Sequence, residues 1–235
     1  MPGRRAGMAV ELHRQVAELL LQAYQPCGAF AAACASMRWA PTSGHVPRGF
    51  CGAARDLREV ELVLVCAEPG DPHARESHGG ASPMEQLRSA YAYAYMCFRD
   101  GKDLFHRNIR HILDTCFPNQ PIDQQLRRVW ITDSVKCSAR KEGGSVPVAV
   151  ARECRDRFLT RELALFPDAV VAALGKKAAD RLIGVPNIVR VGAVAPPYGN
   201  TKAARDTWRR IAEAVQTRRA SQTAPTPERR PRSES

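Results

Sequence analysis

Short apolar runs and helix-like segments alternate along most of the chain. The runs are almost continuously apolar, and they lie at 62–66 (LVLVC), 129–132 (VWIT), 169–174 (AVVAAL) and 188–191 (IVRV). Strands buried on both faces, as in a parallel sheet, have this composition. We therefore expect four parallel strands.

Between the runs, apolar residues recur at the spacing of amphipathic helices. Helices are expected at 83–98, 103–117, 149–166, 176–184 and 201–219, and one helix or two short ones at 8–38. The Gly- and Pro-rich segment 40–56 is expected to be a loop. Strands separated by helices predict an α/β fold with helices on both faces of the sheet.

Length and composition suit one globular domain with tails. The chain has 235 residues, of which 44% are hydrophobic and 25% charged, as in soluble proteins. We expect an N-terminal tail at 1–9, the domain at 10–216 and a disordered basic tail at 217–235. No apolar stretch approaches the roughly 18 residues of a membrane span. Charged residues interrupt the N-terminal segment at helical spacing, which favours an amphipathic helix over a signal peptide. We expect a cytoplasmic monomer that does not enter a membrane.

The chain carries a net charge of +11. Such an excess is typical of proteins that bind polyanions, because each phosphate contact releases counterions. The alternative is a basic surface that only aids solubility, since several arginines lie in the C-terminal tail.

Eight cysteines occur without a secretory signal, so metal ligation or plain burial is favoured over disulfides. Cys97 and Cys116 lie in apolar helical segments and are expected in the core.

Polar or Gly- and Pro-rich residues follow each of the four runs, at Cys66–Asp71, Asp133–Cys137, Gly175–Lys177 and Ala195–Asn200. Ligands of parallel α/β sheets bind outside the carboxyl ends of the strands. The sequence therefore predicts a site formed by these exits.

The ordered motifs VLVCAEPG, GKDLFHRNIRHILD, VWITDSVKCS, Cys154, DAVVAALGKKAA and VGAVAPPYGNTKAARDTW resemble the uracil-DNA glycosylase superfamily, in particular its iron–sulfur branch. The resemblance covers about residues 10–216. It implies a three-layer α/β/α sandwich around a four-stranded parallel sheet. It also implies a DNA-binding enzyme that flips a base into a pocket and hydrolyses its N-glycosidic bond.

The resemblance assigns roles to the CAEPG turn and to Phe105. The iron–sulfur branch has its Glu at the place of Ala67 and a Gly at the place of Cys66. Glu68 matches the next position, where other branches carry an Asp or Asn that orients the attacking water, and a carboxylate there can also stabilise an oxocarbenium ion. Its alternatives are a solvated turn residue or a helix cap. The substrate-binding residues of the turn would be Cys66, Ala67, Pro69 and Gly70. Phe105 would stack on the flipped base, although a core position is its default interpretation.

Two further positions of the site differ from the family pattern. Asp133 stands where an Asn reads uracil, and an ionised Asp can only accept hydrogen bonds, so a different base is expected unless Asp133 is protonated. Ala195 and Pro196 replace the His-Pro pair whose imidazole donates to the leaving base. Removal of such a donor costs about 100- to 1,000-fold in rate. His73 and His78 could supply a donor, or they could be exposed loop residues.

The resemblance also implies a [4Fe–4S] cluster, with zinc as the chemical rival. Its ligands would be Cys27, Cys34, Cys137 and Cys154, and Cys51 could replace either of the first two. The alternative is four buried thiols. The basic, Gly-rich loop after Cys137 would contact phosphates.

Three functions follow from these observations. The first is a DNA glycosylase acting on a deaminated or damaged base. The second is a DNA-binding module that has lost catalysis. The third is a hydrolase acting on a small molecule, for which the sequence offers no G-x-S-x-G or P-loop motif.

Overall fold

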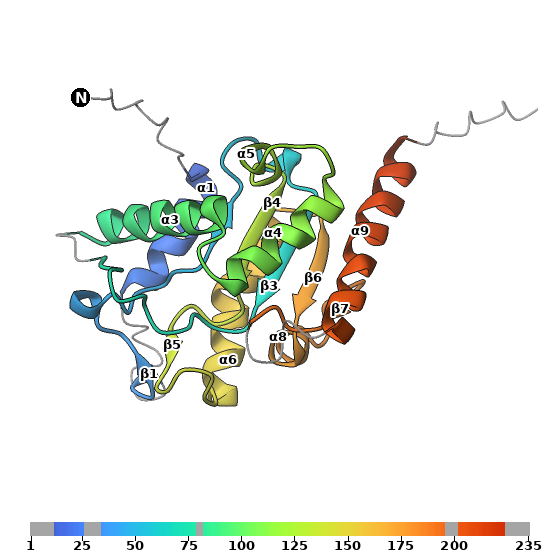
Figure 1. Ribbon diagram of the computed structural model, residues 1–235. Coiled ribbons are helices and arrows are strands. Elements are labelled where there is room, and N and C mark those ends of the chain that lie inside the picture. Colours follow the sequence, from blue (N-terminus) through green and yellow to red (C-terminus); the bar gives the residue numbers. More distant parts are fainter. Residues whose placement is uncertain (1–11, 26–33, 79–81, 196–201, 224–235) are drawn as a thin grey trace, which may run out of the picture.

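The computed structural model describes residues 12–25, 34–78, 82–195 and 202–223, and it shows a mixed α/β fold around a mostly parallel sheet (Figure 1). The order of the strands across the sheet is β2 (Cys51–Gly52), β4 (Val129–Asp133), β3 (Leu62–Cys66), β6 (Val170–Leu174) and β7 (Val189–Val191). The last four of these are mutually parallel and correspond to the four apolar runs.

The expected number of four strands in the sheet is wrong, because the structure has a fifth. β2 pairs antiparallel with β4, with Cys51 opposite Ile131 and Gly52 opposite Trp130. It lies within segment 40–56, which we expected to be a loop. A strand of two residues in a Gly- and Pro-rich segment has no periodic pattern that a sequence can display.

The helices that the structure describes follow the expected segments, except for the short α5, which was not predicted. They are α1 (Arg14–Leu21), α3 (Pro83–Asp100), α4 (Leu104–Cys116), α5 (Ile122–Gln125), α6 (Val148–Cys154), α7 (Thr160–Ala164), α8 (Lys176–Arg181) and α9 (Lys202–Thr223). Short 3₁₀ turns lie at Gln22–Tyr24, Pro41–Ser43 and Leu57–Glu59, and a π-helical turn, Arg155–Leu159, joins α6 to α7. No helix among these residues is long and apolar enough to cross a membrane.

Two expected boundaries differ from the structure. Among the described residues of 8–38, Arg14–Leu21, Gln22–Tyr24 and Cys34 are helical, whereas Met37–Arg38 forms strand β1. β1 pairs with β5 (Ser138–Ala139), which is about a hundred residues later in the chain, so no local pattern could indicate it. Helix α9 continues past residue 216, where we placed the end of the domain, as far as Thr223.

Local capping residues account for the starts of helices α3 and α4. Ser82 and Glu85 form a reciprocal capping box at the start of α3, which has Pro83 as its first residue. Asp103 caps α4 by accepting a hydrogen bond from the His106 backbone at 3.0 Å. These caps place the beginning of α4 close to the end of α3.

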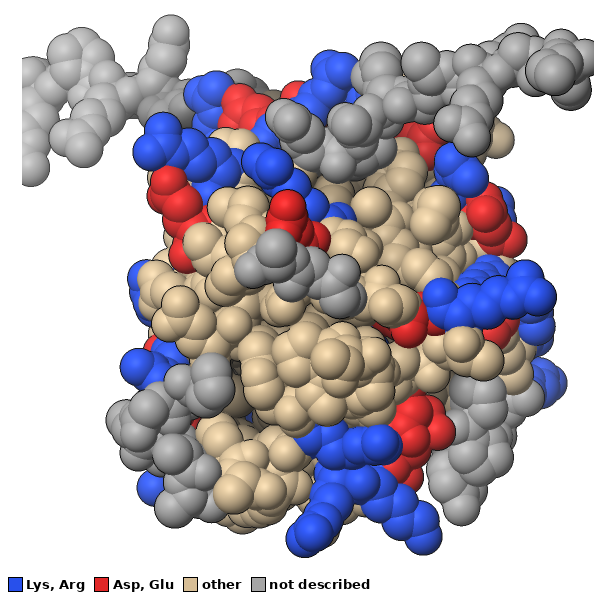
Figure 2. Space-filling model, turned by 90° about the vertical axis from the view of Figure 1, so that its left-hand side faces the viewer, with Lys and Arg blue, Asp and Glu red and all other residues tan. Residues whose placement is uncertain are grey.

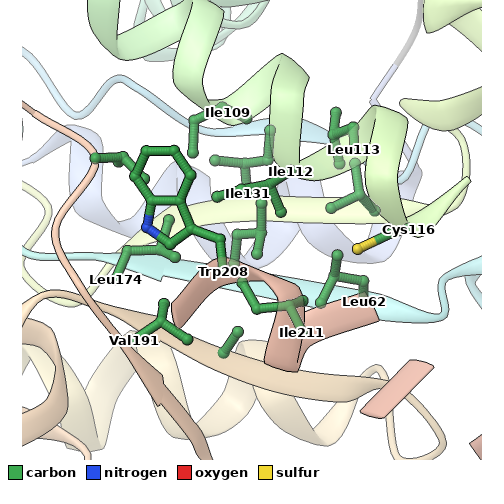
Figure 3. Close-up of a cluster of buried hydrophobic side chains, with 14 of the residues drawn as sticks. Leu62, Ile109, Ile112, Leu113, Cys116, Ile131, Leu174, Val191, Trp208 and Ile211 are labelled. Carbon is green, nitrogen blue, oxygen red and sulfur yellow. The ribbon is translucent and has the colours of Figure 1, made fainter. Parts of the chain in front are cut away.

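The core lies on both faces of the sheet, because alternate residues of each strand point to opposite sides. Leu62 and Leu64 belong to the face covered by α4 and α9, where Ile109, Trp208 and other buried side chains meet (Figure 3). Val63 and Val65 belong to the opposite face, which packs against residues of α1, α3 and α8. Each fully buried large side chain contributes about 1.5–3 kcal/mol. Cys97 and Cys116 are 3% and 1% exposed, as expected for core residues.

Candidate functional site at the carboxyl ends of the strands

The exits of β3 and β4 remain paired after the strands end. The Ser134 backbone N–H donates to the Cys66 carbonyl at 2.9 Å, and the Val135 N–H donates to the Ala67 carbonyl at 3.1 Å. The Ala67 carbonyl also accepts from Ser134 Oγ at 2.6 Å and from Arg181 Nη1 at 2.7 Å. Two of the predicted exits therefore form one rigid surface.

Glu68 lies between two cations from helix α8. Lys177 Nζ is 2.7 Å from Glu68 Oε1, and Arg181 Nη1 is 2.7 Å from Oε2. The side chain of Glu68 is only 6% exposed, so it is not the solvated turn residue of the alternative interpretation. Oε2 accepts no well-aligned hydrogen bond from the described residues despite the short contact with Arg181. Because Lys177 and Arg181 follow strand β6, a third strand exit joins the same site.

Asp133 ends β4 directly opposite Cys66 of β3 and is 6% exposed. Burial raises the pKa of Asp133 to about 7, and the carboxylate of Glu68 acts in the same direction, against Lys136, Arg48 and Arg181. Burial likewise raises the pKa of the Cys66 thiol well above its usual range. Asp133 therefore exchanges its proton near neutral pH. Its protonated form can donate one hydrogen bond as well as accept others.

The loop before β2 covers Asp133. Gly49 has a φ of +84°, and a Cβ at this position would lie 2.8 Å from Asp133 Oδ2. The adjacent Arg48 is buried, donates to the carbonyls of Val46 and Gly70, and lies 3.4 Å from the Glu76 carboxylate through Nε. The sequence analysis missed Arg48, because nothing in a Gly- and Pro-rich segment distinguishes a buried arginine from an exposed one.

A buried ion pair between Lys136 and Glu162 supports the exit of β4. Lys136 contacts Glu162 of α7, and their side chains are 3% and 0% exposed. Glu162 Oε2 also accepts from Trp130 Nε1 at 2.9 Å and from Thr132 Oγ1 at 2.7 Å, while Lys136 Nζ donates to the Asp133 carbonyl at 2.7 Å. The sequence analysis missed Glu162 as well, since it occupies an ordinary position in a charged helical segment.

Histidines form a polar network between loop 71–78 and the start of α4. His73 Nε2 is 3.1 Å from Asp103 Oδ2, and His106 Nδ1 is 2.8 Å from Asp103 Oδ1. Burial raises the pKa of Asp103, but the hydrogen bonds from His106 and His73 outweigh it and hold that pKa well below its usual range. His78 is 1% exposed and contacts Glu76 at 2.8 Å. His78 is therefore not an exposed loop residue.

Phe105 lies in the first turn of α4 and is half-buried. It packs against the core cluster that includes Cys66 and Val194, and its ring centroid is 6.0 Å from that of Phe98. Asn108, on the same helix, donates to the Val194 carbonyl at 2.9 Å and so holds the β7 exit against α4. Ala195 is exposed. Pro196 lies outside the described residues.

The remaining residues of the CAEPG turn differ in exposure. Pro69 is buried, Ala67 is half-buried and Gly70 is exposed. The Gly70 carbonyl accepts from Ser138 Oγ at 2.9 Å, and Glu142 Oε1 accepts from the Asp71 N–H at 3.3 Å. The loop that follows β5 thus packs directly on the turn.

The predicted metal ligands are described only in part. Cys137 and Cys154 belong to one hydrophobic cluster with Met37. The β1–β5 pairing places the segment that follows Cys34 beside the segment that follows Cys137. Cys27 lies outside the described residues. Within the described ranges, no three His, Cys, Asp or Glu side chains form a group that could hold a metal.

Cys51 does not suit the role of a substitute ligand. It is fully buried in β2 and belongs to the main core cluster rather than to the cluster of Cys137 and Cys154. Burial raises the pKa of its thiol far above the usual range. The structure thus places Cys51 in a different cluster from Cys137 and Cys154.

One surface hollow borders the site, and another lies on α4. The larger one has a volume of about 380 Å³ and includes Lys177 and Arg181 in its lining. The smaller one, of about 270 Å³, lies on α4 beside Arg107, Arg110, His111 and Asp114. Asp133 lines neither hollow. Figure 2 shows one face of the molecule, on which Lys and Arg side chains lie mainly around the edge, next to acidic ones, with an uncharged surface between them.

Comparison of the sequence with models of protein families gives no match, and neither does comparison with curated proteins. The resemblance to the uracil-DNA glycosylase superfamily therefore depends on the ordered motifs alone.

Proposed function

We propose that the chain is a DNA glycosylase that hydrolyses the N-glycosidic bond of a deaminated or damaged base. The observation that carries the proposal is the convergence of two buried carboxylates, Glu68 and Asp133, on adjacent strand exits. Enzymes that cleave glycosidic bonds commonly use two carboxyl groups whose environments give them different pKa values. The proposal includes the three-layer α/β/α arrangement that the resemblance implies.

In this proposal Glu68 faces the sugar of the flipped nucleotide. Its carboxylate accepts a hydrogen bond from the attacking water and stabilises the positive charge that develops on the sugar. Water adds to the anomeric carbon and loses a proton to Glu68, the bond between that carbon and the base nitrogen breaks, and the base departs with the bonding electron pair and takes a proton from solvent. Glu68 then returns its proton to solvent. Lys177 and Arg181 fix the orientation of Glu68 through the two 2.7 Å contacts.

Asp133 would bind the edge of the base, and Phe105 would stack on its face. The raised pKa of Asp133 allows a neutral carboxyl group near pH 7. A neutral carboxyl group, like an amide, both donates and accepts hydrogen bonds. This favours a base with adjacent N–H and C=O groups, as produced by deamination, over an unmodified cytosine.

A DNA-binding module without catalysis is the second candidate. It is favoured by the engagement of Glu68 Oε1 by Lys177 and by the alanine, Ala195, at the position where the family has its histidine. Neither observation affects DNA binding itself.

A panel of oligonucleotides that carry single modified bases, followed by alkaline cleavage, distinguishes the two candidates. We expect strand cleavage at one class of deaminated base and a loss of about 100-fold or more in Glu68→Gln and Asp133→Leu. Asp133→Asn should retain activity, because the amide also donates and accepts hydrogen bonds. DNA binding without base release across the panel would favour the module. Full activity of Glu68→Gln would remove its assigned role.

The cysteine set remains a separate proposal. Cys27, Cys34, Cys137 and Cys154 would hold a [4Fe–4S] cluster, or zinc, that stabilises the loop after Cys137. Measurement of iron, sulfide and zinc in the purified protein tests it. Substitution of Cys137 and Cys154 by Ser should release the metal, whereas Cys51→Ser should not. Size-exclusion chromatography on the same sample tests the expected monomer.

A further inference from the structure

The larger hollow is a groove between helices α6 and α8. Helices α6 and α8 with the residues that follow them form its walls, together with the end of the loop after β5. Its lining consists of Val146, Val148, Ala151, Arg152, Arg155, Lys177, Asp180, Arg181 and Ile183. Val148, Ala151 and Arg152 lie on one face of α6, at spacings of three and four, and Arg155 follows in the π-helical turn. Lys177, Asp180 and Arg181 share one face of α8 in the same way, and Ile183 lies two residues beyond its end. The volume of about 380 Å³ is within the range of about 300–1,000 Å³ that is typical of ligand sites.

The groove is positively charged. Four lining residues are cations, and the one carboxylate of the lining, Asp180, is paired with Lys176 at 2.6 Å. Arg155 is paired with its neighbour Asp156 at 2.8 Å. The side chain of Arg152 is exposed and forms no hydrogen bond or ion pair with the residues that the structure describes. At least one cation is thus fully available to an anionic ligand.

The groove also exposes apolar side chains. Val148 is 74% exposed and Ile183 is 64% exposed, and they come from opposite walls. They are two of the three large hydrophobic side chains that are exposed among the described residues. Such side chains beside cations suit a ligand in which charged and apolar groups alternate, rather than an inorganic anion.

The groove is connected to the predicted site. Lys177 lines the groove, contacts Glu68 Oε1 at 2.7 Å and donates to the carbonyls of Gly143 and Gly144 at 3.0 and 2.7 Å. Arg181 lines the groove as well and contacts Glu68 Oε2. Lys177 and Arg181 therefore lie between Glu68 and a ligand bound in the groove.

We propose that the α6–α8 groove binds the sugar–phosphate backbone of a DNA strand next to the site that contains Glu68. Arg152 and Arg155 contact phosphates, while Val148 and Ile183 contact sugars or base faces. The lining has no aromatic side chain on which a base could stack, so the groove reads the backbone and not the sequence. This inference rests on the proposed DNA-directed function and identifies the surface that it uses.

The test compares two double variants of the full chain, Arg152→Ala/Arg155→Ala and Arg55→Ala/Arg58→Ala. The two arginines of the control pair are also three positions apart. Arg55 has no partner among the described residues, and Arg58 is paired with the nearby Asp56, as Arg155 is with Asp156. It precedes β3 and so lies at the opposite end of the strands. Binding of a fluorescent oligodeoxynucleotide is measured over a range of salt concentrations, and base release is measured separately.

We expect the groove variant to lose about 10-fold or more in affinity and to reduce the salt dependence by about one ion per arginine. The control should bind like the unmodified protein. Val148→Ser/Ile183→Ser should weaken binding without a change in salt dependence. Equal binding by the groove variant and the control would overturn the inference, even if base release persisted and the proposed function stood.

A protein that releases no base but binds DNA through the groove would retain this inference and lose the catalytic proposal. A protein that binds polyglutamate in a groove-dependent manner, and not DNA, would overturn the inference in favour of an acidic protein partner.

Discussion

Lys177 and Glu68 are joined by a contact of 2.7 Å although they lie 109 positions apart in the chain. The same ammonium group binds two carbonyls of the loop after β5. One side chain therefore connects the exits of β3 and β6 to a loop that packs on the CAEPG turn. The site is built from contacts of this kind, and they can be tested by substitution.

Lys136→Met should destabilise the fold by about 3–5 kcal/mol, because it leaves the carboxylate of Glu162 buried without a cation. Urea unfolding measures this loss. In Lys136→Met/Glu162→Gln, the neutral amide can still accept from Trp130 and Thr132, so the double variant should lose less than the sum of the two single variants.

Lys176→Met is the control for this pair. Lys176 is 86% exposed and paired with Asp180 on the surface, so its loss should cost less than about 0.5 kcal/mol. Similar unfolding curves for Lys136→Met and Lys176→Met would show that the buried pair contributes nothing.

Gly49→Ala should be more destabilising than Gly184→Ala. Both glycines have positive φ angles, +84° and +94°, so both variants incur a backbone cost of about 1–2 kcal/mol. A Cβ at Gly184 meets nothing within 4 Å, whereas one at Gly49 approaches Asp133 Oδ2 at 2.8 Å. The excess cost at Gly49 should shrink when Asp133 is replaced by Ala. If the extra cost of Gly49→Ala were the same in the Asp133→Ala protein, the added Cβ would not be in conflict with Asp133.

The contribution of Asp133 to the free energy of unfolding should fall as the pH rises from about 4 to about 7. The pKa of Asp133 is raised by burial from 3.8 to about 7 in the folded protein. Between these values the folded state holds a proton that the unfolded chain has released, so raising the pH favours unfolding. Above pH 7 the contribution is constant.

Asp133→Asn removes this titration and leaves the other carboxylates in place. The difference in unfolding free energy between the variant and the unmodified protein should therefore change between about pH 4 and about pH 7. The variant should gain relative stability at the higher pH. A difference that is independent of pH would mean that Asp133 is ionised throughout this range.

Truncation after residue 216 should destabilise the domain, whereas truncation after Thr223 should not. Helix α9 extends to Thr223, and within its last turns Arg219 Nε lies 2.5 Å from Glu61 Oε2 and the guanidinium lies 5.2 Å from the Phe117 ring. We expect the shorter chain to lose about 1–2 kcal/mol, as one partly buried ion pair and one cation–π contact disappear. Equal melting temperatures of the two chains would support the original boundary at 216.

The sequence alone determined the elements whose signals are local. The runs that became β3, β4, β6 and β7 are recognisable because strands buried on both faces must be apolar throughout. The start of α3 is encoded in a Ser82–Glu85 box with Pro83, which are neighbours in the chain. The site could also be predicted at the strand exits, because the carboxyl ends of parallel strands lie at one edge of the sheet and polar residues follow each of them.

Only the tertiary structure decided how these exits are connected and charged. The two-residue strands β1, β2 and β5 exist through partners far away in the chain. Arg48 and Glu162 are ordinary charged residues until the fold buries them beside Glu76 and Lys136. The proton affinity of Asp133 likewise depends on its burial. A pattern of neighbouring residues can encode periodicity and capping, but burial and pairing are set by the elements that fold against them.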